Sequence, residues 1–333
     1  MTPDASIIAV NSLSKHYKVA SREAGLKAAT KSLFKRSFNT VKAVDQITFR
    51  IDAGEIVGFL GPNGAGKTTT LKMLSGLLYP TSGAARVLGF EPSRRQADFL
   101  QQVALVMGNR SQLNWDLPAV DSFELLRSIY GIPRQQFLQT RDDFIELLEI
   151  QELVKKPVRN LSLGERMKVE IVGALLHRPR VLFLDEPTLG LDVIMQRRIR
   201  SFITEYNQRY GATVLLTSHY MADVEALCKR VIVIHNGRLL FDGDLSELIG
   251  RFSAYKTIDV TFSGNYSNWS QYGEVLTRDA AHVSLRVPKA ETPDRTARIL
   301  AEQKVDDLTV EDPPIEDVIE KVFSQKSANG EAA

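Results

Sequence analysis

The segment GPNGAGKTT, residues 61–69, combines closely spaced glycines with a lysine and two hydroxyl side chains. Glycines let successive backbone N–H groups turn inward around phosphate oxygens, and a following helix adds its positive dipole end. The strand-like run EIVGFL precedes the segment and the helical run KTTTLKMLSGLL follows it, as a phosphate-binding loop requires. Lys67 would reach the β and γ phosphates, and the Thr68 hydroxyl would bind magnesium. The predicted binding residues of this loop are Gly61, Pro62, Asn63, Gly64, Ala65, Gly66, Lys67, Thr68 and Thr69.

Two adjacent carboxylates end the apolar run VLFLDEP, residues 181–187. Ligands of open parallel sheets bind at the carboxyl ends of the strands, so Asp185 is predicted to join the magnesium shell. Glu186, the next residue, would point to the other side of the backbone and polarise an attacking water. The alternative is that both acids simply face solvent at the end of a strand.

The segment NLSLGERMKVE, residues 160–170, predicts the start of a helix. Ser162 and Glu165 have the spacing of a capping box. A helix N-terminus can also hold a phosphate, because its N–H groups and dipole attract an anion. Local sequence therefore leaves two interpretations open, a capped helix or a second phosphate site.

The order GPNGAGKTT, LSLGE, LFLDEP, LGLD and TSH resembles the ATP-binding subunit of an ABC transporter, over about residues 6–248. The resemblance implies that the chain binds ATP with Mg²⁺ and hydrolyses the ATP. It also implies a head-to-tail homodimer in which each ATP lies between one subunit's phosphate loop and the other's signature. The signature residues concerned are Ser162, Gly164 and Glu165. Closure on ATP binding and loosening on hydrolysis would convert chemistry into motion.

The resemblance assigns roles to three further residues. His219, in TSHYMADVE, resembles the switch histidine that contacts the γ-phosphate, and it joins Lys67 and Glu186 as the predicted catalytic set. Asp192, in LGLD, resembles the residue that links the two active sites across the dimer. Tyr17, in LSKHY, resembles the aromatic residue that stacks on adenine, although a segment inserted after it changes the usual spacing to the next strand.

Two departures from the family pattern affect the site. The signature reads LSLGE where LSGGQ is commonest, although the serine and the second glycine are retained. After VALVM the family usually has a glutamine that touches magnesium and senses the permease. Counting back from Asp116 places Asn109 in register, whereas residue type selects Gln112. Both stay candidates for nucleotide binding, and Gln112 joins Thr68 and Asp185 in the predicted metal set.

Strand-like and helical runs alternate along most of the chain, which predicts an α/β fold with a parallel sheet covered by helices. The expected strands include VALVM, VLFLD, TVLLTS and VIVIH, and the expected helices lie near 119–129, 134–150 and 193–210. The resemblance implies a P-loop NTPase core of the ABC ATPase type, with an antiparallel β subdomain and a helical subdomain at about 109–179.

The sequence pattern changes near residue 250. KTIDVTF, GEVLTR and HVSLRV are followed by a helical run near 291–303 and a strand near 305–310, which is typical of an antiparallel sheet covered on one face. We therefore predict an ABC ATP-binding domain at 1–249, a small α+β accessory domain at 250–323 and a disordered tail at 324–333. The accessory domain would stabilise the dimer, regulate it or be a passive appendage.

A basic segment, residues 18–42, interrupts the strand pattern and is predicted to be an insertion. Lys27, Lys31 and Lys35 recur every four residues, and nearby leucine and phenylalanine side chains supply a partial apolar face. Such a helix would contact an acidic membrane or a partner; the alternative is a solvated basic insertion.

Composition narrows the cellular setting. The net charge of +2 over 333 residues gives no reason to expect a nucleic-acid partner. Cys228 is the single cysteine, so no internal disulfide or zinc site is expected, nor a disulfide-linked partner, and a reducing cytoplasm fits. No signal peptide and no run of about 20 apolar residues is present. A membrane role would therefore come through a partner, at the cytoplasmic face of the cell membrane.

Two classes of function follow from these features. The first is the ATPase subunit of an exporter with a separately encoded integral membrane permease, with an importer subunit as its near variant. The second is a soluble ABC ATPase that acts on nucleic acid or ribosomes. The second class lacks support, because the chain has no long heptad segment, no zinc cysteines and no second cassette.

Overall fold

The computed structural model describes residues 6–20, 38–108, 111–253, 255–263 and 268–313, together with residues 318, 319 and 322. The chain divides into two compact units, Met1–Asp242 and Gly243–Ala333. This division falls before residue 250, where we predicted the boundary, because helix α9 (Leu245–Phe252) belongs to the second unit. The tail at 324–333 lies outside the described residues.

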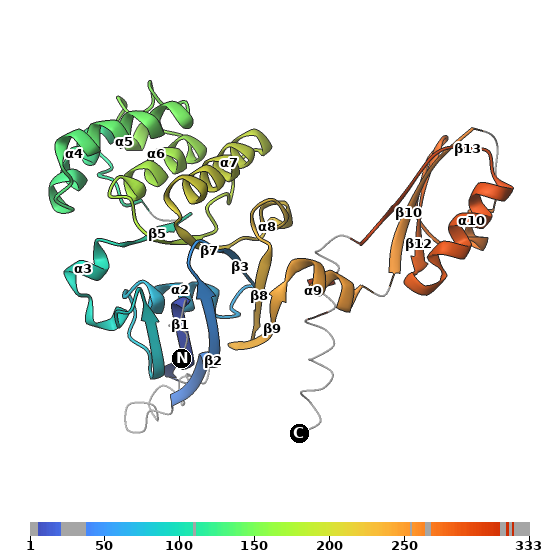
Figure 1. Cartoon of the computed structure of the whole chain (residues 1–333), viewed down its shortest axis with the longest axis horizontal. Helices are drawn as coiled ribbons and strands as arrows, with labels where there is room; N and C mark the ends of the chain where they lie inside the picture. Colours follow the sequence, from blue (N-terminus) through green and yellow to red (C-terminus); the bar gives the residue numbers. More distant parts are fainter. Residues whose placement is uncertain are drawn as a thin grey trace, which may run out of the picture. The chain divides into compact units, whose positions relative to one another are not determined.

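The larger sheet of the first unit has the strand order β5-β6-β7-β3-β8-β9 (Figure 1). Its strands are β5 (Val103–Met107), β6 (Val181–Asp185), β7 (Thr213–Thr217), β3 (Ile56–Leu60), β8 (Arg230–His235) and β9 (Arg238–Asp244). The first five pair in parallel. Every residue of β6 and β7 is buried, as expected of continuous apolar strands whose two faces are both covered. This arrangement brings the carboxyl ends of β3, β6 and β7 to one edge.

The smaller sheet of this unit is antiparallel, with the order β2-β1-β4. Its strands are β1 (Ser6–Ala20), β2 (Phe38–Asp52) and β4 (Ser82–Val87). The prediction that an insertion replaces strand structure from 18 to 42 is wrong at both ends, because 18–20 pair with 38–40 as strands. The lysine-rich part that we predicted to be helical lies outside the described residues.

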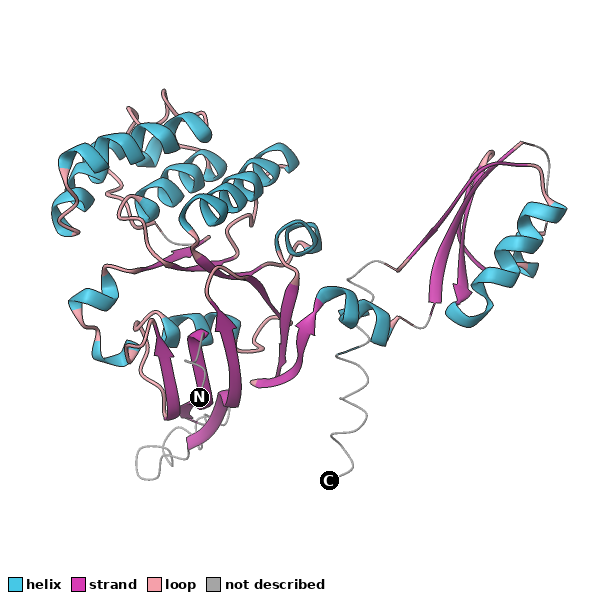
Figure 2. Ribbon diagram, in the orientation of Figure 1, coloured by secondary structure: helices cyan, strands magenta, loops and turns pink. Residues whose placement is uncertain are grey.

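The helices of the first unit lie on either side of the larger sheet (Figure 2). They are α2 (Lys67–Leu74), α3 (Ala97–Leu100), α4 (Ala119–Ile129), α5 (Arg134–Leu147), α6 (Leu163–Leu175), α7 (Val193–Tyr210) and α8 (Met221–Leu227), with short 3-10 turns η1 (Pro92–Arg94) and η2 (Val158–Asn160). α5 ends before residue 150, and the left-handed backbone of Glu149 (φ 52°) follows. α7 ends where Gly211 adopts φ 63°, a conformation that costs glycine little. α6 packs against β5, α4 and α5.

One hydrophobic core joins the two sheets of this unit. It contains Ile8 and Val10 of β1, Phe59 of β3, Leu71 of α2 and Phe183 of β6, all of them almost completely buried. α2 therefore packs between the antiparallel sheet and the larger sheet, and this packing fixes the loop that precedes α2.

The second unit has its own sheet and core. The antiparallel order is β11-β12-β10-β13, built from β10 (Tyr255–Phe262), β11 (Glu274–Arg278), β12 (His282–Pro288) and β13 (Val305–Glu311), with α10 (Thr292–Glu302) and the 3-10 turns η3 (Trp269–Gln271) and η4 (Lys289–Glu291). The core includes Ile258, Trp269, Val283 and Ile299. The predicted fold class, an α/β core with antiparallel and helical subdomains and a small α+β domain, is confirmed.

Candidate active site

The predicted phosphate-binding loop connects β3 to α2. Its turn depends on glycine, because Gly66 has φ 110° and a Cβ there would lie 2.4 Å from the carbonyl oxygen of Ala43. A Cβ on Gly61 would likewise lie 2.2 Å from the carbonyl oxygen of Ile234. Asn63 and Gly64 are exposed, Gly61, Pro62, Thr68 and Thr69 are partly buried, and Ala65, Gly66 and Lys67 are buried. The loop thus presents its tip to solvent and its helix end to the core.

Lys67 fills the loop from inside. Its ammonium nitrogen donates to the carbonyl oxygen of Gly61 at 2.5 Å and to that of Pro62 at 3.1 Å. Burial lowers the pKa of Lys67, while the nearby carboxylates of Glu186 and Asp185 act to raise it. Phosphate oxygens could replace the two carbonyl oxygens as acceptors of these hydrogen bonds.

The Asp185 carboxylate lies among hydroxyl groups at the end of β6. The Thr68 hydroxyl lies 2.8 Å and 3.1 Å from its two carboxylate oxygens, and the Thr217 hydroxyl donates to it at 2.8 Å. Asp185 is only 9% exposed. Hydroxyl and carboxylate oxygens are hard ligands, and Mg²⁺ in nucleotide sites is commonly held by one or two such groups with phosphate. Thr68 and Asp185 therefore fit the predicted ion, and Thr217 orients the carboxylate.

Glu186 and His219 form a pair. The His219 Nε2 atom lies 2.8 Å from the Glu186 carboxylate, and both side chains are partly exposed. Glu186 has a left-handed backbone, with φ 55°, which is uncommon for a residue other than glycine. The backbone N–H of Glu186 donates to the carbonyl and hydroxyl oxygens of Thr217, each at 3.1 Å, and so holds this conformation. The structure thus brings together the predicted base and the predicted switch histidine.

A buried carboxylate that we did not predict connects the loops of this pair. Asp223 is 1% exposed and accepts hydrogen bonds from the hydroxyls of Thr188 and Ser218. Arg200 of α7 donates to its other oxygen at 2.7 Å. Ser218 precedes His219, and Thr188 follows Glu186 by two positions. The single available signal in the sequence was an acid four residues after a histidine, which is too common to be informative.

The signature segment forms the capping box at the start of α6. The Ser162 hydroxyl accepts from the backbone N–H of Glu165 at 3.3 Å, and the Glu165 carboxylate accepts from the backbone N–H of Ser162 at 2.9 Å. The hydrogen bond from the Ser162 N–H, and after it one from the Ser162 side chain, lower the pKa of Glu165. At Gly164 a Cβ would lie 3.5 Å from side-chain atoms of Leu191 and Met195. The capping interpretation is therefore realised, and the signature packs beside the start of α7.

Asp192 and Tyr17 have local roles in this structure. Asp192 caps α7 by accepting a hydrogen bond from the backbone N–H of Met195 at 2.8 Å. Tyr17 lies on β1 and is 40% exposed, with the Lys15 ammonium 5.3 Å from the centre of its ring. Tyr17 pairs with Val41 of β2, so the strand continues past it. An exposed ring on this strand leaves a face for a base to stack on.

The loop after β5 is described at Gly108 and again from Ser111 onward, so Asn109 lies outside the described residues. The Gln112 side-chain nitrogen donates to the carbonyl oxygen of Leu105 in β5, and the backbone N–H of Gln112 donates to Glu170 at 2.8 Å. The side-chain oxygen of Gln112 is the atom that would contact a cation.

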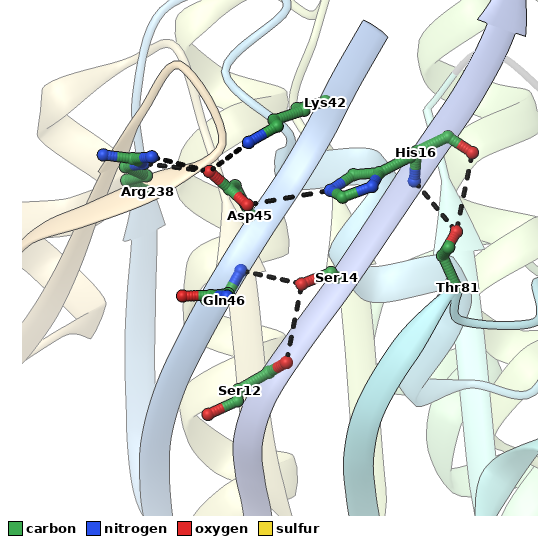
Figure 3. Close-up of polar contacts among 8 residues, drawn as sticks. All are labelled: Ser12, Ser14, His16, Lys42, Asp45, Gln46, Thr81 and Arg238. Atoms are coloured by element: carbon green, nitrogen blue, oxygen red, sulfur yellow. Dashed lines mark hydrogen bonds and ion pairs between the residues drawn. The ribbon is translucent and has the colours of Figure 1, made fainter. Parts of the chain in front are cut away.

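A polar cluster around Asp45 joins β2 to β9 (Figure 3). Asp45 of β2 is 8% exposed and accepts from Arg238 of β9 at 2.8 Å and 3.0 Å, with the Lys42 ammonium at 3.5 Å. The bonds from Arg238 lower the pKa of Asp45. The Asp45 N–H donates to the carbonyl oxygen of Gly237, whose N–H donates to that of Ala65 in the phosphate loop. The sequence did not predict this cluster, because its members are far apart along the chain.

Comparisons with known proteins bear on both units. The ABC transporter family model matches residues 44–189, and the model described as "EvrA-like ABC transporter, C-terminal domain" matches residues 254–311. In the described parts of the chain, no helix combines the length and the apolar character needed to cross a membrane.

Relatives and solved structures agree with these matches. The chain is 35% identical over 215 residues to the ABC transporter ATP-binding protein NatA of Bacillus subtilis, covering 65% of this chain and 87% of NatA. It is 32% identical over 250 residues to the linearmycin resistance ATP-binding protein LnrL of Bacillus subtilis, covering 75% of this chain and 78% of that protein. A solved ATP-binding subunit of an ABC transporter superposes with a TM-score of 0.62 and 26% identity, over 74% of this chain and 93% of that one. With the predicted phosphate loop, the Thr68–Asp185 contact and the Glu186–His219 pair in place, this chain belongs to the ABC transporter ATP-binding proteins and is an ATPase of that family.

Proposed function

We propose that two copies of this ATPase close around ATP and drive a separate integral membrane permease in the direction of export. The observation that carries the dimer is the position of the signature within one chain. Figure 1 shows α6 among α4, α5 and α7, with strands of the larger sheet between α6 and α2. The phosphate loop and the signature of one chain therefore lie apart. In a dimer, the signature of the second copy would meet the phosphate loop of the first.

The capping box at Ser162 is compatible with this role. The Ser162 oxygen accepts from the Glu165 N–H within its own helix, and the hydroxyl proton would turn toward a phosphate oxygen that the neighbouring subunit brings to it. The Glu165 carboxylate is engaged by the Ser162 N–H, which limits its repulsion toward an incoming γ-phosphate. Positive dipole at the start of α6 favours the same contact.

The residues of one chain would divide the chemistry of hydrolysis. Lys67 would move from its two carbonyl acceptors onto phosphate oxygens, in a buried site where charge attraction is strong. Thr68 and Asp185 would hold one Mg²⁺ per site, and the bound ion neutralises phosphate charge. Glu186 would accept a proton from the attacking water, and His219, bonded to Glu186, would orient the carboxylate.

Direction, partners and location complete the proposal. One relative is named for linearmycin resistance, which supports export. The match of the second unit to an ABC transporter C-terminal domain supports a permease partner, and that partner would hold the chain at the cytoplasmic face of the membrane. We propose no nucleic-acid partner and no disulfide-linked partner. Cys228 is buried and its pKa is raised to about 12 by burial, so its thiol is unreactive.

A base variant tests the chemistry and the dimer together. We expect Glu186→Gln to bind ATP normally, to accumulate as a dimer with ATP and to lose about 99% of turnover, a loss within the range of general base removal. Size-exclusion chromatography with and without ATP measures the dimer, and phosphate release measures turnover. Hydrolysis at the wild-type rate would show that Glu186 is not the base.

Mixed variants test whether each site is shared between subunits. Lys67→Ala removes the phosphate-loop charge, and Ser162→Arg blocks the signature. We expect each variant alone to be inactive and an equal mixture to regain activity, because one composite site per mixed dimer is complete. Full activity of either single variant, or no recovery on mixing, would contradict the shared site.

A further inference from the structure

A lysine of strand β1 covers one face of the exposed Tyr17 ring. Lys15 and Tyr17 are two positions apart, and the Lys15 ammonium nitrogen lies over the ring, 5.3 Å from its centre. A cation at this place is attracted by the negative face of the aromatic ring. Tyr17 is nevertheless 40% exposed, and Lys15 leaves the opposite face of the ring to a planar ligand.

The segment that follows α2 fixes Lys15 in turn. The Lys15 ammonium nitrogen donates to the carbonyl oxygen of Tyr79 at 2.8 Å. The N–H of Leu78 donates at 2.9 Å to the carbonyl oxygen of Lys72, which lies in the last turn of α2. The Lys15 side chain therefore connects the Tyr17 ring to the helix that starts at the phosphate loop.

Two further hydrogen bonds hold β1 against the same segment. The Thr81 N–H donates to the carbonyl oxygen of Ser14 at 2.7 Å, and the His16 N–H donates to the Thr81 hydroxyl at 3.0 Å (Figure 3). Three consecutive residues of β1 thus bond to Tyr79 or Thr81. These bonds set the position of β1 relative to α2, and so to the phosphate loop, in the protein without nucleotide.

We propose that Lys15 is the positioning residue that holds the Tyr17 ring ready for the base of the nucleotide and thereby sets the contribution of adenine to ATP affinity. This inference rests on the proposed function, in which the phosphate loop holds ATP, and on the predicted stacking of adenine on Tyr17. A ring that is fixed before the base arrives loses little side-chain freedom on binding, so more of the stacking energy appears as affinity.

Lys15→Met tests this role, because it keeps an unbranched side chain and removes the cation. We expect the ratio of the affinities for ATP and for inorganic tripolyphosphate, which has no base, to fall about fivefold, since the ring is then ordered only when the base binds. Isothermal titration calorimetry without Mg²⁺ measures both affinities. Lys18→Met removes an exposed charge from the same strand and is the matched control, in which the ratio should equal that of wild type.

A double-mutant cycle tests whether Lys15 acts through the ring. Tyr17→Ala alone should lower the same ratio, and Lys15→Met should lower it no further in that background. Lys15→Arg should keep most of the wild-type ratio, because a guanidinium also lies on aromatic faces.

Three results would each overturn the inference. They are additive effects in the double mutant, an unchanged ratio in Lys15→Met, and an equal fall of the ratio in Lys15→Arg and Lys15→Met. Failure of the proposed function is distinguishable, because it would appear in the wild type as the absence of a dimer with ATP and Mg²⁺, whereas these affinities are measured without Mg²⁺.

Discussion

At the residue scale, the proposed mechanism of hydrolysis depends on how the Glu186–His219 pair is held. Asp223 bonds to Ser218 beside His219 and to Thr188 beyond Glu186, and Arg200 balances its charge. A buried carboxylate with one arginine and two hydroxyl donors is fully satisfied, and a network of this kind is rigid. Asp223 therefore keeps the two loops at a fixed separation.

We expect Asp223→Asn to lower the rate of ATP turnover about tenfold and to leave ATP affinity unchanged, since the amide donor faces donors and the loops would separate. Steady-state phosphate release and binding of a fluorescent nucleotide measure the two quantities. Glu225→Gln, an exposed change on the same helix, should behave as wild type. A turnover rate equal to that of wild type in Asp223→Asn would show that the network is structural only.

The residues of the site differ in how far sequence could identify them. Thr68 and Asp185 were predicted as a metal pair from two motifs, and the structure places their oxygens 2.8 Å apart. No role was predicted for Thr217, Asp223 or Glu170, because each bonds to a residue that is far away along the chain. Their residue types are ordinary for their positions, and only the fold reveals their partners.

At the element scale, Asp45 joins β2, the β8–β9 turn and the phosphate loop. Arg238 holds the pKa of Asp45 below its usual value, so ionised Asp45 stabilises the folded state. That contribution is complete above the pKa of an unfolded aspartate, about 3.9, and is lost as the pH falls through the lower folded value.

We expect Asp45→Asn to reduce the free energy of unfolding by about 1–3 kcal/mol at pH 7, because bonds to a charged acceptor are weakened. Urea denaturation at a series of pH values measures this difference. The difference should begin to shrink below about pH 4, where unfolded Asp45 takes up a proton, and should vanish once the pH is below the lower folded pKa. Asp142→Asn, an exposed change on α5, is the control, and an effect of equal size there would contradict the assignment.

Sequence identified the elements that are locally distinctive. β6, β7 and β8 are unbroken apolar runs, and the structure contains them at the expected places. β4 was not predicted, since SGAARV has few β-branched residues and three exposed positions at its start. The outer parts of β1 and β2 were also missed. Val19 and Val41 are exposed there, so no alternation of buried and exposed residues marks these strands in the sequence. The outer parts of β1 and β2 are strands because they pair with each other.

At the scale of the whole molecule, the two units have separate cores. Among the described residues, the core of the first unit draws on none after residue 242, and that of the second on none before residue 243. Domains with their own cores can fold alone. The two tryptophans report on different units, because Trp115 is 47% exposed in the first and Trp269 is 2% exposed in the second.

We expect a chain ended after Asp244, which keeps β9 whole, to fold and to bind ATP within about twofold of the full chain, since separate cores make the two units' stabilities nearly additive. In Trp115→Phe, Trp269 alone reports on the second unit, and its emission should shift to longer wavelength at a urea concentration different from that at which ATP binding is lost. A chain ended after Pro288 is the matched control, because it lacks α10 and β13 and should lose the short-wavelength emission of Trp269. Two results would together mean that the two units fold as one cooperative body. They are loss of ATP binding and of Trp269 burial at the same urea concentration, and failure of the chain ended after Asp244 to fold.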